Sequence, residues 1–272
     1  MWHFIIPLLC RRGWFACEPG EVNNLILLNL VRYMNLVIDF GNTRVKAALF
    51  KGHELIEAKV YNSADELAED KAFFSAASRC IIGSVLNSDK RIPEALNAIK
   101  NILFFTSEIK IPLKNSYKTV ATLGSDRLAA AIGAYSLYPM KNTLVIDAGT
   151  CLKFNFTTGN GEYLGGAISP GLQMRFKALQ HFTDKLPLVE MNYDFDKIIG
   201  ETTEESILSG VVNGILQETE GLINEYKKMY PDLTIVVCGG DTDFFAKRLK
   251  NRIFAHPHLV MVGLNETLIF NS

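Results

Sequence analysis

The chain has 272 residues, of which 48% are hydrophobic and 21% are charged, and its formal net charge is −1. This length and composition fit one or two globular domains with sizeable cores. The near-neutral charge gives no electrostatic support for binding to nucleic acid or to an anionic membrane. The five cysteines form no CxxC pair and no disulfide framework, which fits a reducing cytoplasm.

The first 33 residues differ from the rest of the chain. Their short apolar run lacks the positively charged start of a secretory signal, and it is shorter than the roughly twenty residues that span a membrane. Met34 directly precedes the first strand-like segment. We therefore expect Met34 to be the natural start and residues 1–33 to be an upstream extension outside the fold, without a catalytic role. A membrane-active leader is the alternative.

The segment LVIDFG at residues 36–41 recurs as LVIDAG at residues 144–149. Each copy is an apolar run that ends in Asp and Gly, and Thr43 or Thr150 follows. A buried strand that delivers Asp to a tight turn can present the carboxylate to a metal-bound phosphate. The Thr hydroxyl and the turn amides can donate to phosphate oxygens. Two such segments predict a duplicated domain with a nucleotide between the halves.

The residues after each Asp-Gly turn alternate with a period of two, which is typical of a β-strand. In the second copy Leu152, Phe154 and Phe156 share one face, and Lys153 lies on the other face near the Asp147 turn. We therefore predict that each turn bends a β-hairpin. A P-loop or a dinucleotide-binding turn would open a helix, and neither of those motifs occurs at these turns.

Further elements follow in chain order. We predict helices over residues 63–77, 91–100, 126–138, 173–182 and 202–230, and the last of these begins with the capping-box pattern Thr202-x-x-Glu205. Strands are predicted over residues 80–86, 101–106 and 233–238, and hairpin strands extend to Ile168. We place the domain boundary near residue 143, which gives an N-terminal domain of residues 34–143 and a C-terminal domain of residues 144–272.

Gly124, Ser125, Asp126 and Arg127 lie just before an apolar helix. The structural interpretation makes Ser125 the N-cap and lets Asp126 favour the helix dipole. The functional interpretation pairs a base with a carboxylate-binding guanidinium, which suits an acidic substrate that carries a hydroxyl. Both interpretations stay open on the residues alone.

From Met34 to the C-terminus, the motifs together resemble those of the type III pantothenate kinases, which belong to the acetate and sugar kinase/actin-like ATPase superfamily. DFGNTRVK at 39–46 and DAGT at 147–150 are similar to the two phosphate motifs, and GSDR at 124–127 is similar to the pantothenate-binding GxDR. GGAISPG at 165–171 and CGG at 238–240 match two further turns. The resemblance implies an α/β, duplicated actin-like (ribonuclease H-like) two-domain kinase fold with mixed sheets.

The implied reaction is the ATP-dependent phosphorylation of pantothenate to 4′-phosphopantothenate, the first step of coenzyme A biosynthesis, in the cytoplasm. The resemblance implies that Asp126 accepts the proton and that Asp147 binds a monovalent cation, K⁺ or NH₄⁺. The implied pantothenate contacts are Tyr117, Gly124, Ser125, Asp126, Arg127 and, from across a homodimer interface, Thr183. The implied contacts to ATP with Mg²⁺ are Asp39, Phe40, Gly41, Asn42, Thr43, Arg44, Val45, Lys46 and Thr150.

The sequence departs from the family pattern at several positions. The family's Pro is Val120, the Thr of its TGG is Cys238, and its A-x-T-x-D positions carry Cys151, Lys153 and Asn155. We expect that the Lys153 ammonium reaches Asp147 or the phosphates and replaces the monovalent cation. A solvated surface Lys153 is the alternative.

A different function also stays open on the sequence. A regulator derived from the same family could bind nucleotide without turnover. Intact Asp126 and Arg127 argue against it, because a regulator does not need the pair at the acceptor site.

Overall fold

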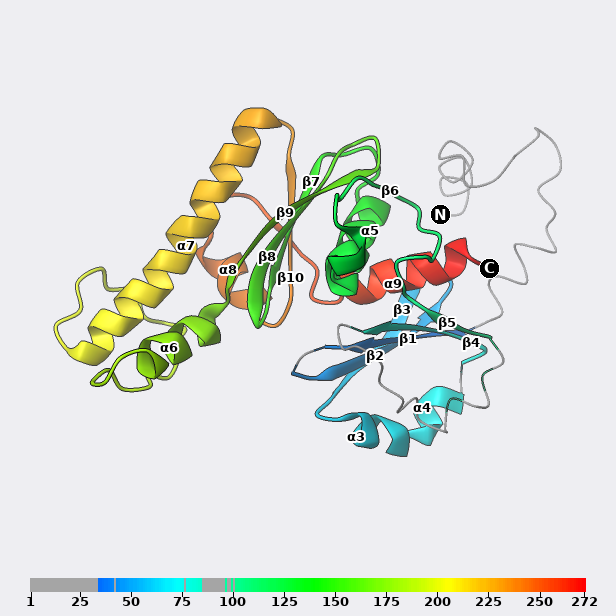
Figure 1. The fold of residues 1–272 in the computed structure, drawn as a ribbon, viewed down its shortest axis with the longest axis horizontal. Coiled ribbons are helices and arrows are strands. Elements are labelled where there is room, and N and C mark those ends of the chain that lie inside the picture. The colour runs from blue at the N-terminus through cyan, green and yellow to red at the C-terminus, as the bar shows by residue number, and fades with distance from the viewer. Residues whose placement is uncertain (1–33, 42, 76, 85–95, 97–98, 100) are drawn as a thin grey trace. The chain divides into compact units, whose positions relative to one another are not determined.

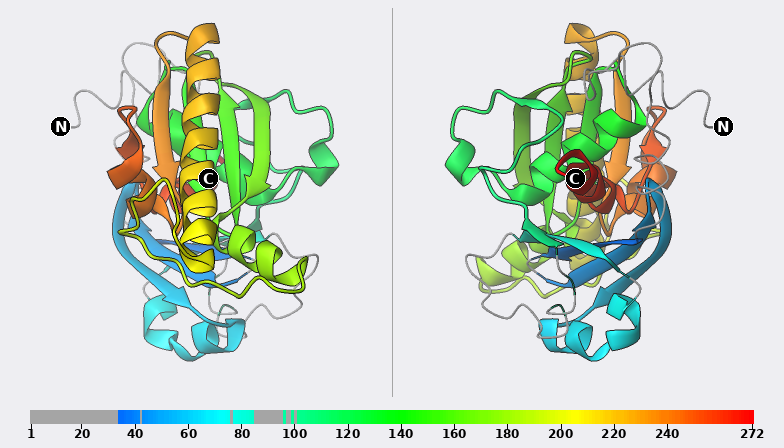
Figure 2. Two further views of the ribbon diagram at one scale, coloured as in Figure 1. Left: turned by 90° about the vertical axis from the view of Figure 1, so that its left-hand side faces the viewer. Right: turned by 90° about the vertical axis from the view of Figure 1, so that its right-hand side faces the viewer.

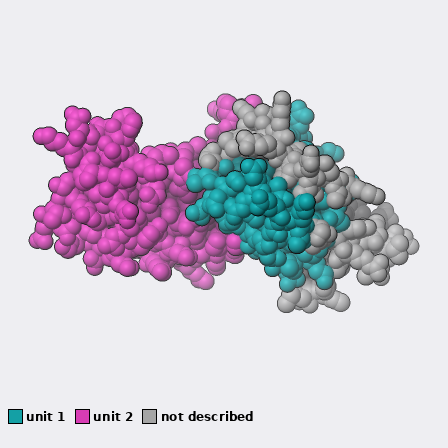
Figure 3. Space-filling view, turned by 90° about the horizontal axis from the view of Figure 1, so that it is seen from below, with its two compact units in different colours: residues 1–112, 264–272 teal, residues 113–263 magenta. Residues whose placement is uncertain are grey.

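The computed structural model describes residues 34–41, 43–75, 77–84, 96, 99 and 101–272 (Figure 1). The described residues form two compact units (Figure 3). Unit 1 contains those up to residue 112 and residues 264–272, and unit 2 contains residues 113–263. The expectation for residues 1–33 lies outside the described residues, as does nearly all of the helix expected over residues 91–100.

Unit 1 is built on a five-stranded mixed sheet with the order β3-β2-β1-β4-β5. Strands β1 and β2 form an antiparallel hairpin, β3 extends it, and β4 and β5 add parallel strands on the other side. The bounds are β1 (Met34–Phe40), β2 (Val45–Lys51), β3 (Glu54–Tyr61), β4 (Arg79–Ser84) and β5 (Asn101–Phe104).

Unit 2 repeats this plan in a six-stranded sheet with the order β11-β10-β7-β8-β9-β6. Strands β7, β8 and β9 are antiparallel neighbours, and β10 and β11 add parallel strands beside β7. Without the short edge strand β6, the order and the strand directions are those of unit 1. The bounds are β6 (Lys114–Asn115), β7 (Thr143–Ala148), β8 (Cys151–Thr157), β9 (Glu162–Pro170), β10 (Thr234–Cys238) and β11 (Phe254–Ala255).

Helices cover both faces of the sheet in unit 2, with α7 on one face and α5 on the other (Figures 1 and 2). The larger core contains Phe154 of β8, Phe176 of α6 and Val212 of α7. The smaller core packs Ala130 and Ala134 of α5 against β7 and β10. The helices of unit 2 are α5 (Ser125–Leu137), α6 (Leu172–His181), α7 (Thr203–Met229) and α8 (Thr242–Arg248), with a 3₁₀ turn, η3 (Val120–Thr122).

Both predicted hairpins are confirmed, and α7 begins at the predicted cap. The Thr202 hydroxyl accepts a hydrogen bond from the Glu205 backbone N–H at 3.1 Å. The helix expected over residues 63–77 is instead two short helices, α3 (Ala64–Glu69) and α4 (Lys71–Ser75). The break is at Asp70, whose carboxylate accepts bonds from Lys59 and Tyr61 and so holds the chain to β3.

The division into compact units differs from the sequence division at residue 143. It lies at residues 112 and 113, and again within the last helix, α9 (Leu259–Phe270), between Gly263 and Leu264. Helix α5 groups with the second sheet because it packs on β7 and β8. The boundary at 143 instead follows the start of the repeated motif, and it stays a proposal. Among the described residues, no helix has the length and apolar character needed to cross a membrane.

Candidate active site

The two repeated turns place an Asp opposite a Lys in each hairpin. In unit 1, Asp39 at the end of β1 pairs in register with Lys46 of β2. In unit 2, Asp147 near the end of β7 pairs in register with Lys153 of β8. Both Asp residues are buried, with 8% and 6% of their surface exposed. Each turn therefore presents a carboxylate and an amine on the same face of its sheet.

Asp126 and Arg127 lie in the first turn of α5. Gly124 is the N-cap, and the structure corrects the interpretation that Ser125 caps the helix. A Cβ at Gly124 would lie 2.6 Å from Asp126 Oδ1, so a glycine leaves room for this carboxylate. Asp126 Oδ1 accepts the Arg127 backbone N–H at 2.8 Å, which orients the carboxylate beside its own helix start.

Lys153 joins Asp126 to Asp147. Its Nζ lies 2.6 Å from Asp126 Oδ2 and 2.6 Å from Asp147 Oδ2, and its side chain is 17% exposed. Burial lowers the pKa of Lys153, but the two carboxylates outweigh burial and raise it above its ordinary value. The predicted contact with Asp147 is therefore confirmed, and the alternative of a solvated surface Lys is wrong.

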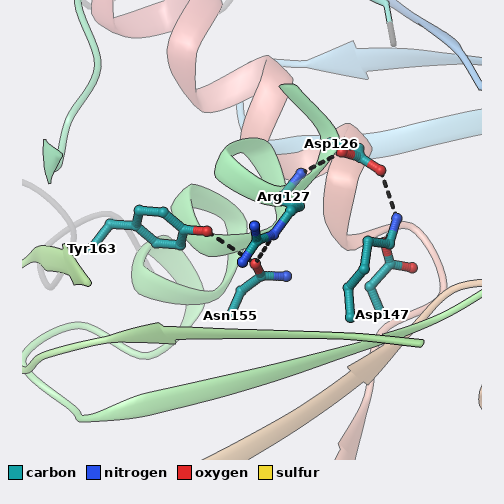
Figure 4. A network of polar contacts seen from close by, with 6 residues as sticks. Asp126, Arg127, Asp147, Asn155 and Tyr163 are labelled. Carbon is teal, nitrogen blue, oxygen red and sulfur yellow. Dashed lines mark hydrogen bonds and ion pairs between the residues drawn. The ribbon is translucent and has the colours of Figure 1, made fainter. Parts of the chain in front are cut away.

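Arg127 lies in a second network, one residue further along α5. Its Nε donates to Asn155 Oδ1 at 2.8 Å, and the Tyr163 hydroxyl donates to the same oxygen at 3.0 Å (Figure 4). Burial raises the pKa of Tyr163 to about 12, although Arg127 opposes the shift, so the hydroxyl stays protonated. The predicted contact residue Tyr117 places its ring 5.4 Å from the guanidinium carbon.

Two donors of this network point to a missing acceptor. Arg127 and Asn155 are 5% and 0% exposed, and within the described part of the chain Arg127 Nη2 and Asn155 Nδ2 have no hydrogen-bond partner. The two donors to Asn155 Oδ1 fix the orientation of the amide, so its nitrogen is a donor. A buried donor without an acceptor costs about 1–3 kcal/mol, and a ligand oxygen would remove that cost.

The turn after β10 also approaches Asp147. Cys238 pairs in register with Asp147, and the next residue, Gly239, has a φ of +95°. A Cβ at Gly239 would lie 2.8 Å from Asp147 Oδ1 and 2.2 Å from the Ala148 carbonyl oxygen. The glycine is required here by both its backbone conformation and the close approach.

The first phosphate motif lies in unit 1. Phe40 and Val45 are core residues there, so only their backbone could face a ligand. The Gly41 N–H donates to the Arg44 carbonyl at 3.1 Å, which closes the turn. Asn42 lies outside the described residues. The searched residues hold no group of three or more His, Cys, Asp or Glu side chains that could cage a metal ion.

Thr183 follows α6 and lies apart from this network. Its hydroxyl donates to the Leu179 carbonyl at 2.6 Å, and the residue is exposed. Phe182 beside it is 80% exposed, and Ile198 and Ile199 in the next loop are 72% and 78% exposed. Phe182 is thus an exposed aromatic side chain directly adjacent to Thr183 in the sequence.

The sequence did not assign Asn155 or Tyr163 to the site. Strand alternation put Asn155 on the face of Lys153 but gave no partner for it, because its contact with Arg127 joins residues 28 apart. Asn155 and Thr157 on this face of β8 are fully buried, so the face is packed against other residues.

A family model and the curated relatives of this chain indicate the same family. The model of the type III pantothenate kinase family matches residues 35–225. A type III pantothenate kinase of Christiangramia forsetii is 44% identical over 88% of this chain and 99% of its own length. One of Flavobacterium johnsoniae is 41% identical over 86% of this chain and 97% of its own length.

Solved structures are similar in fold. A conserved Campylobacter jejuni protein, provisionally described as a Baf family transcriptional activator, is 22% identical with a TM-score of 0.56 and covers 87% of this chain and 98% of its own. A Listeria monocytogenes protein, provisionally described as an N-acetylmannosamine kinase, is 15% identical with a TM-score of 0.51 and covers 88% and 99%. These likenesses agree with the duplicated actin-like fold.

Proposed function

This chain belongs to the type III pantothenate kinase family, and we propose the residues through which it performs the family's reaction. The enzyme is a phosphotransferase that phosphorylates pantothenate in coenzyme A biosynthesis. A regulator without turnover is not favoured, since the relatives are kinases and the pair Asp126 and Arg127 is retained. ATP is the phosphoryl donor, and we assign the reaction to the cytoplasm.

Asp126 is the proposed general base. Its carboxylate is 19% exposed at the start of α5, so it is held in place and still reachable. A base must lie within hydrogen-bond distance of the hydroxyl that it deprotonates. Asp126 would orient the primary hydroxyl of pantothenate and accept its proton as the new oxygen–phosphorus bond forms.

Arg127 is proposed to bind pantothenate next to this hydroxyl, with Gly124, Ser125 and Tyr117 completing the acceptor site. The support is the pair of buried donors, Arg127 Nη2 and Asn155 Nδ2, that lack an acceptor among the described residues. A carbonyl or carboxylate oxygen of pantothenate would accept from both. The guanidinium faces the neutral Asn155, so its charge is available to an anionic substrate.

ATP is proposed to contact residues 39–46 and Thr150, the two segments that follow the repeated strands. Mg²⁺ usually binds through one or two carboxylates together with substrate phosphates, and a single strand-end Asp39 fits that pattern. When bound, the ion would neutralise charge on the phosphates. The protein's share is positioning, which is most of what phosphoryl transfer requires.

The Lys153 ammonium is proposed to replace the monovalent cation beside Asp147. A potassium ion would need the oxygen that Lys153 Nζ already contacts at 2.6 Å. The raised pKa of Lys153 keeps that positive charge in place. The residues therefore do not fit a bound monovalent cation, and Asp147 serves as the anchor of the ammonium.

A homodimer is proposed, with Thr183 reaching pantothenate in the partner's site. The support is the exposed Phe182 next to Thr183 in the sequence, together with the exposed Ile198 and Ile199, apolar side chains that a second copy would cover. Closed two-fold pairs are also the commonest oligomers.

A coupled assay of ADP release tests the function. ADP should appear with ATP and Mg²⁺ only when pantothenate is added, and one phosphate should be found on pantothenate for each ADP. Equal release without pantothenate, or none with it, would contradict the assignment.

A further inference from the structure

The internal repeat assigns Lys153 a counterpart. Asp39 faces Lys46 in the hairpin β1–β2, and Asp147 faces Lys153 in the hairpin β7–β8. Lys153 therefore occupies in the second hairpin the place that Lys46 occupies in the first. Lys46 belongs to the proposed ATP segment, so the repeat puts a second lysine at the second phosphate turn.

Lys153 also contacts Asp126, the proposed general base. Asp126 Oδ1 accepts the Arg127 N–H, and Asp126 Oδ2 accepts the Lys153 ammonium at 2.6 Å. Both oxygens of the proposed base are thus engaged within the protein. The oxygen that contacts Lys153 is the one not held by the backbone of α5, and the substrate hydroxyl needs such an oxygen.

The two contacts of Lys153 differ in how easily they can be exchanged. Asp147 is its cross-strand neighbour, so that contact lies within one hairpin. Asp126 is on another element, and its side chain is 19% exposed compared with 9% for Asp147. An ammonium has three donors on a flexible four-carbon stem, so it can keep one partner and change another.

We propose that Lys153 is a catalytic residue that exchanges Asp126 for the transferred phosphoryl group when ATP binds, while it keeps Asp147. This inference rests on the proposed roles of Asp126 and of the turn at Thr150. The exchange frees Asp126 Oδ2 for the pantothenate hydroxyl only when a nucleotide is present. It also brings a positive charge to the phosphoryl oxygens, where charge must be stabilised during transfer.

The transfer step moves one proton and one phosphoryl group. The pantothenate hydroxyl gives its proton to Asp126, and its oxygen forms a bond to the γ-phosphorus. The bond from that phosphorus to the bridging oxygen breaks, and the electron pair leaves with ADP. Lys153 transfers no proton in this step and contributes only its positive charge.

The exchange predicts that ATP and pantothenate bind cooperatively. Nucleotide removes Lys153 from Asp126, so pantothenate no longer has to displace an ion pair. Thermodynamic linkage requires the same factor in both orders of addition. Couplings of this kind are typically about 5- to 150-fold in affinity.

Titration calorimetry on the full chain tests the predicted cooperative binding without turnover. The dissociation constant of pantothenate is measured alone and with Mg²⁺ and a β,γ-imido analogue of ATP, in buffers free of potassium and ammonium. The unchanged protein should bind pantothenate at least five times more tightly with the analogue. Lys153→Met should lose this coupling, and Asp126→Asn should lose it as well because it removes the other half of the contact.

The control is Lys228→Met, which breaks an exposed ion pair with Glu225 on α7 and should keep the coupling. Absence of coupling in the unchanged protein overturns the proposal, whatever the variants do. Full coupling in Lys153→Met or in Asp126→Asn also overturns it. If Asp126→Asn loses turnover but keeps the coupling, Asp126 is the base and the exchange is wrong. If it loses the coupling but keeps turnover, the exchange stands and Asp126 is not the base.

Discussion

The charged side chains around Asp126 fall into two groups of opposite excess charge. Asp126 and Asp147 share the single ammonium of Lys153, which leaves one negative charge. Arg127 is bonded to the neutral Asn155, which leaves one positive charge. The first group holds the proposed proton acceptor beside the Lys153 ammonium, and the second is suited to bind an anionic or strongly polar part of pantothenate.

The replacement of a monovalent cation by Lys153 predicts how potassium affects activity. The unchanged enzyme should have the same kcat in sodium, potassium or tetramethylammonium buffers. Lys153→Thr removes the ammonium, so its activity should be low in sodium and rise at least tenfold with potassium. Initial rates from the ADP assay measure both. An unchanged enzyme that is inactive until potassium is added would show that Lys153 is not the substitute.

The role of Asn155 predicts a change in KM. Asn155→Ala leaves Arg127 Nε and the Tyr163 hydroxyl without their shared acceptor, so the guanidinium loses its orientation. A lost buried hydrogen bond of about 1–3 kcal/mol corresponds to a KM for pantothenate that is roughly 5- to 150-fold higher. The KM for ATP should change little. Asn142→Ala, at a turn outside this network, is the control. A KM for pantothenate that equals that of the control would remove Asn155 from the acceptor site.

At the scale of elements, the sequence was most informative where its pattern is local. Period-two alternation and the repeated Asp-Gly turn predicted both hairpins, and Thr202 with Glu205 predicted the start of α7. Helix α9 was missed because its apolar residues surround the helix and are interrupted by the consecutive Asn265, Glu266 and Thr267, so the segment has no amphipathic period. Strand β3 was missed because polar residues such as Glu54, Glu57 and Lys59 interrupt its apolar pattern.

The candidate site was predictable only in part for the same reason. The motifs predicted Asp126, Arg127 and Asp147 one by one. The contact of Lys153 with Asp126 joins β8 to α5, and no local pattern encodes a contact between two such elements. Strand alternation placed Asn155 on the face of Lys153, but it could not identify Arg127 as its partner, because that contact depends on α5 packing on β8.

The turn between β10 and α8 yields a prediction about the position of Asp147. Gly239→Ala puts a methyl group where Asp147 Oδ1 and the Ala148 carbonyl lie, on a backbone with φ of +95°. The carboxylate must shift, so kcat should fall by at least tenfold, and stability should fall by about 1–3 kcal/mol. Gly221→Ala, on α7 with open space around it, is the control. Equal kcat and equal urea midpoints for both variants would contradict the requirement for glycine.

At the scale of the whole molecule, two sheets repeat one strand order and carry equivalent Asp and Lys positions. This duplication was predictable because both copies keep the LVID segment. In unit 2, α5 brings the acceptor residues Asp126 and Arg127 to the face of β8 where Lys153 lies. Unit 2 therefore contains the proposed base Asp126, the Lys153 ammonium that contacts it and the proposed pantothenate contacts.

The proposed homodimer predicts a link between mass and activity. Phe182→Asp replaces the exposed aromatic ring next to Thr183 with a charge, so it should convert the dimer to a monomer. The monomer should bind pantothenate more weakly, because Thr183 of the partner subunit would be absent. Sedimentation velocity gives the mass, and the ADP assay gives the KM. A fully active monomer of the unchanged chain would contradict the shared site.

The most direct measurement of the central claim is the turnover of Asp126→Asn. This substitution keeps the size of the side chain and removes the proton acceptor. The account predicts unchanged thermal stability within a few degrees, retained binding of the ATP analogue, and a kcat about 10²- to 10⁴-fold lower. Near-normal kcat in Asp126→Asn, measured by pantothenate-dependent ADP release, would contradict the assignment of Asp126 as the base.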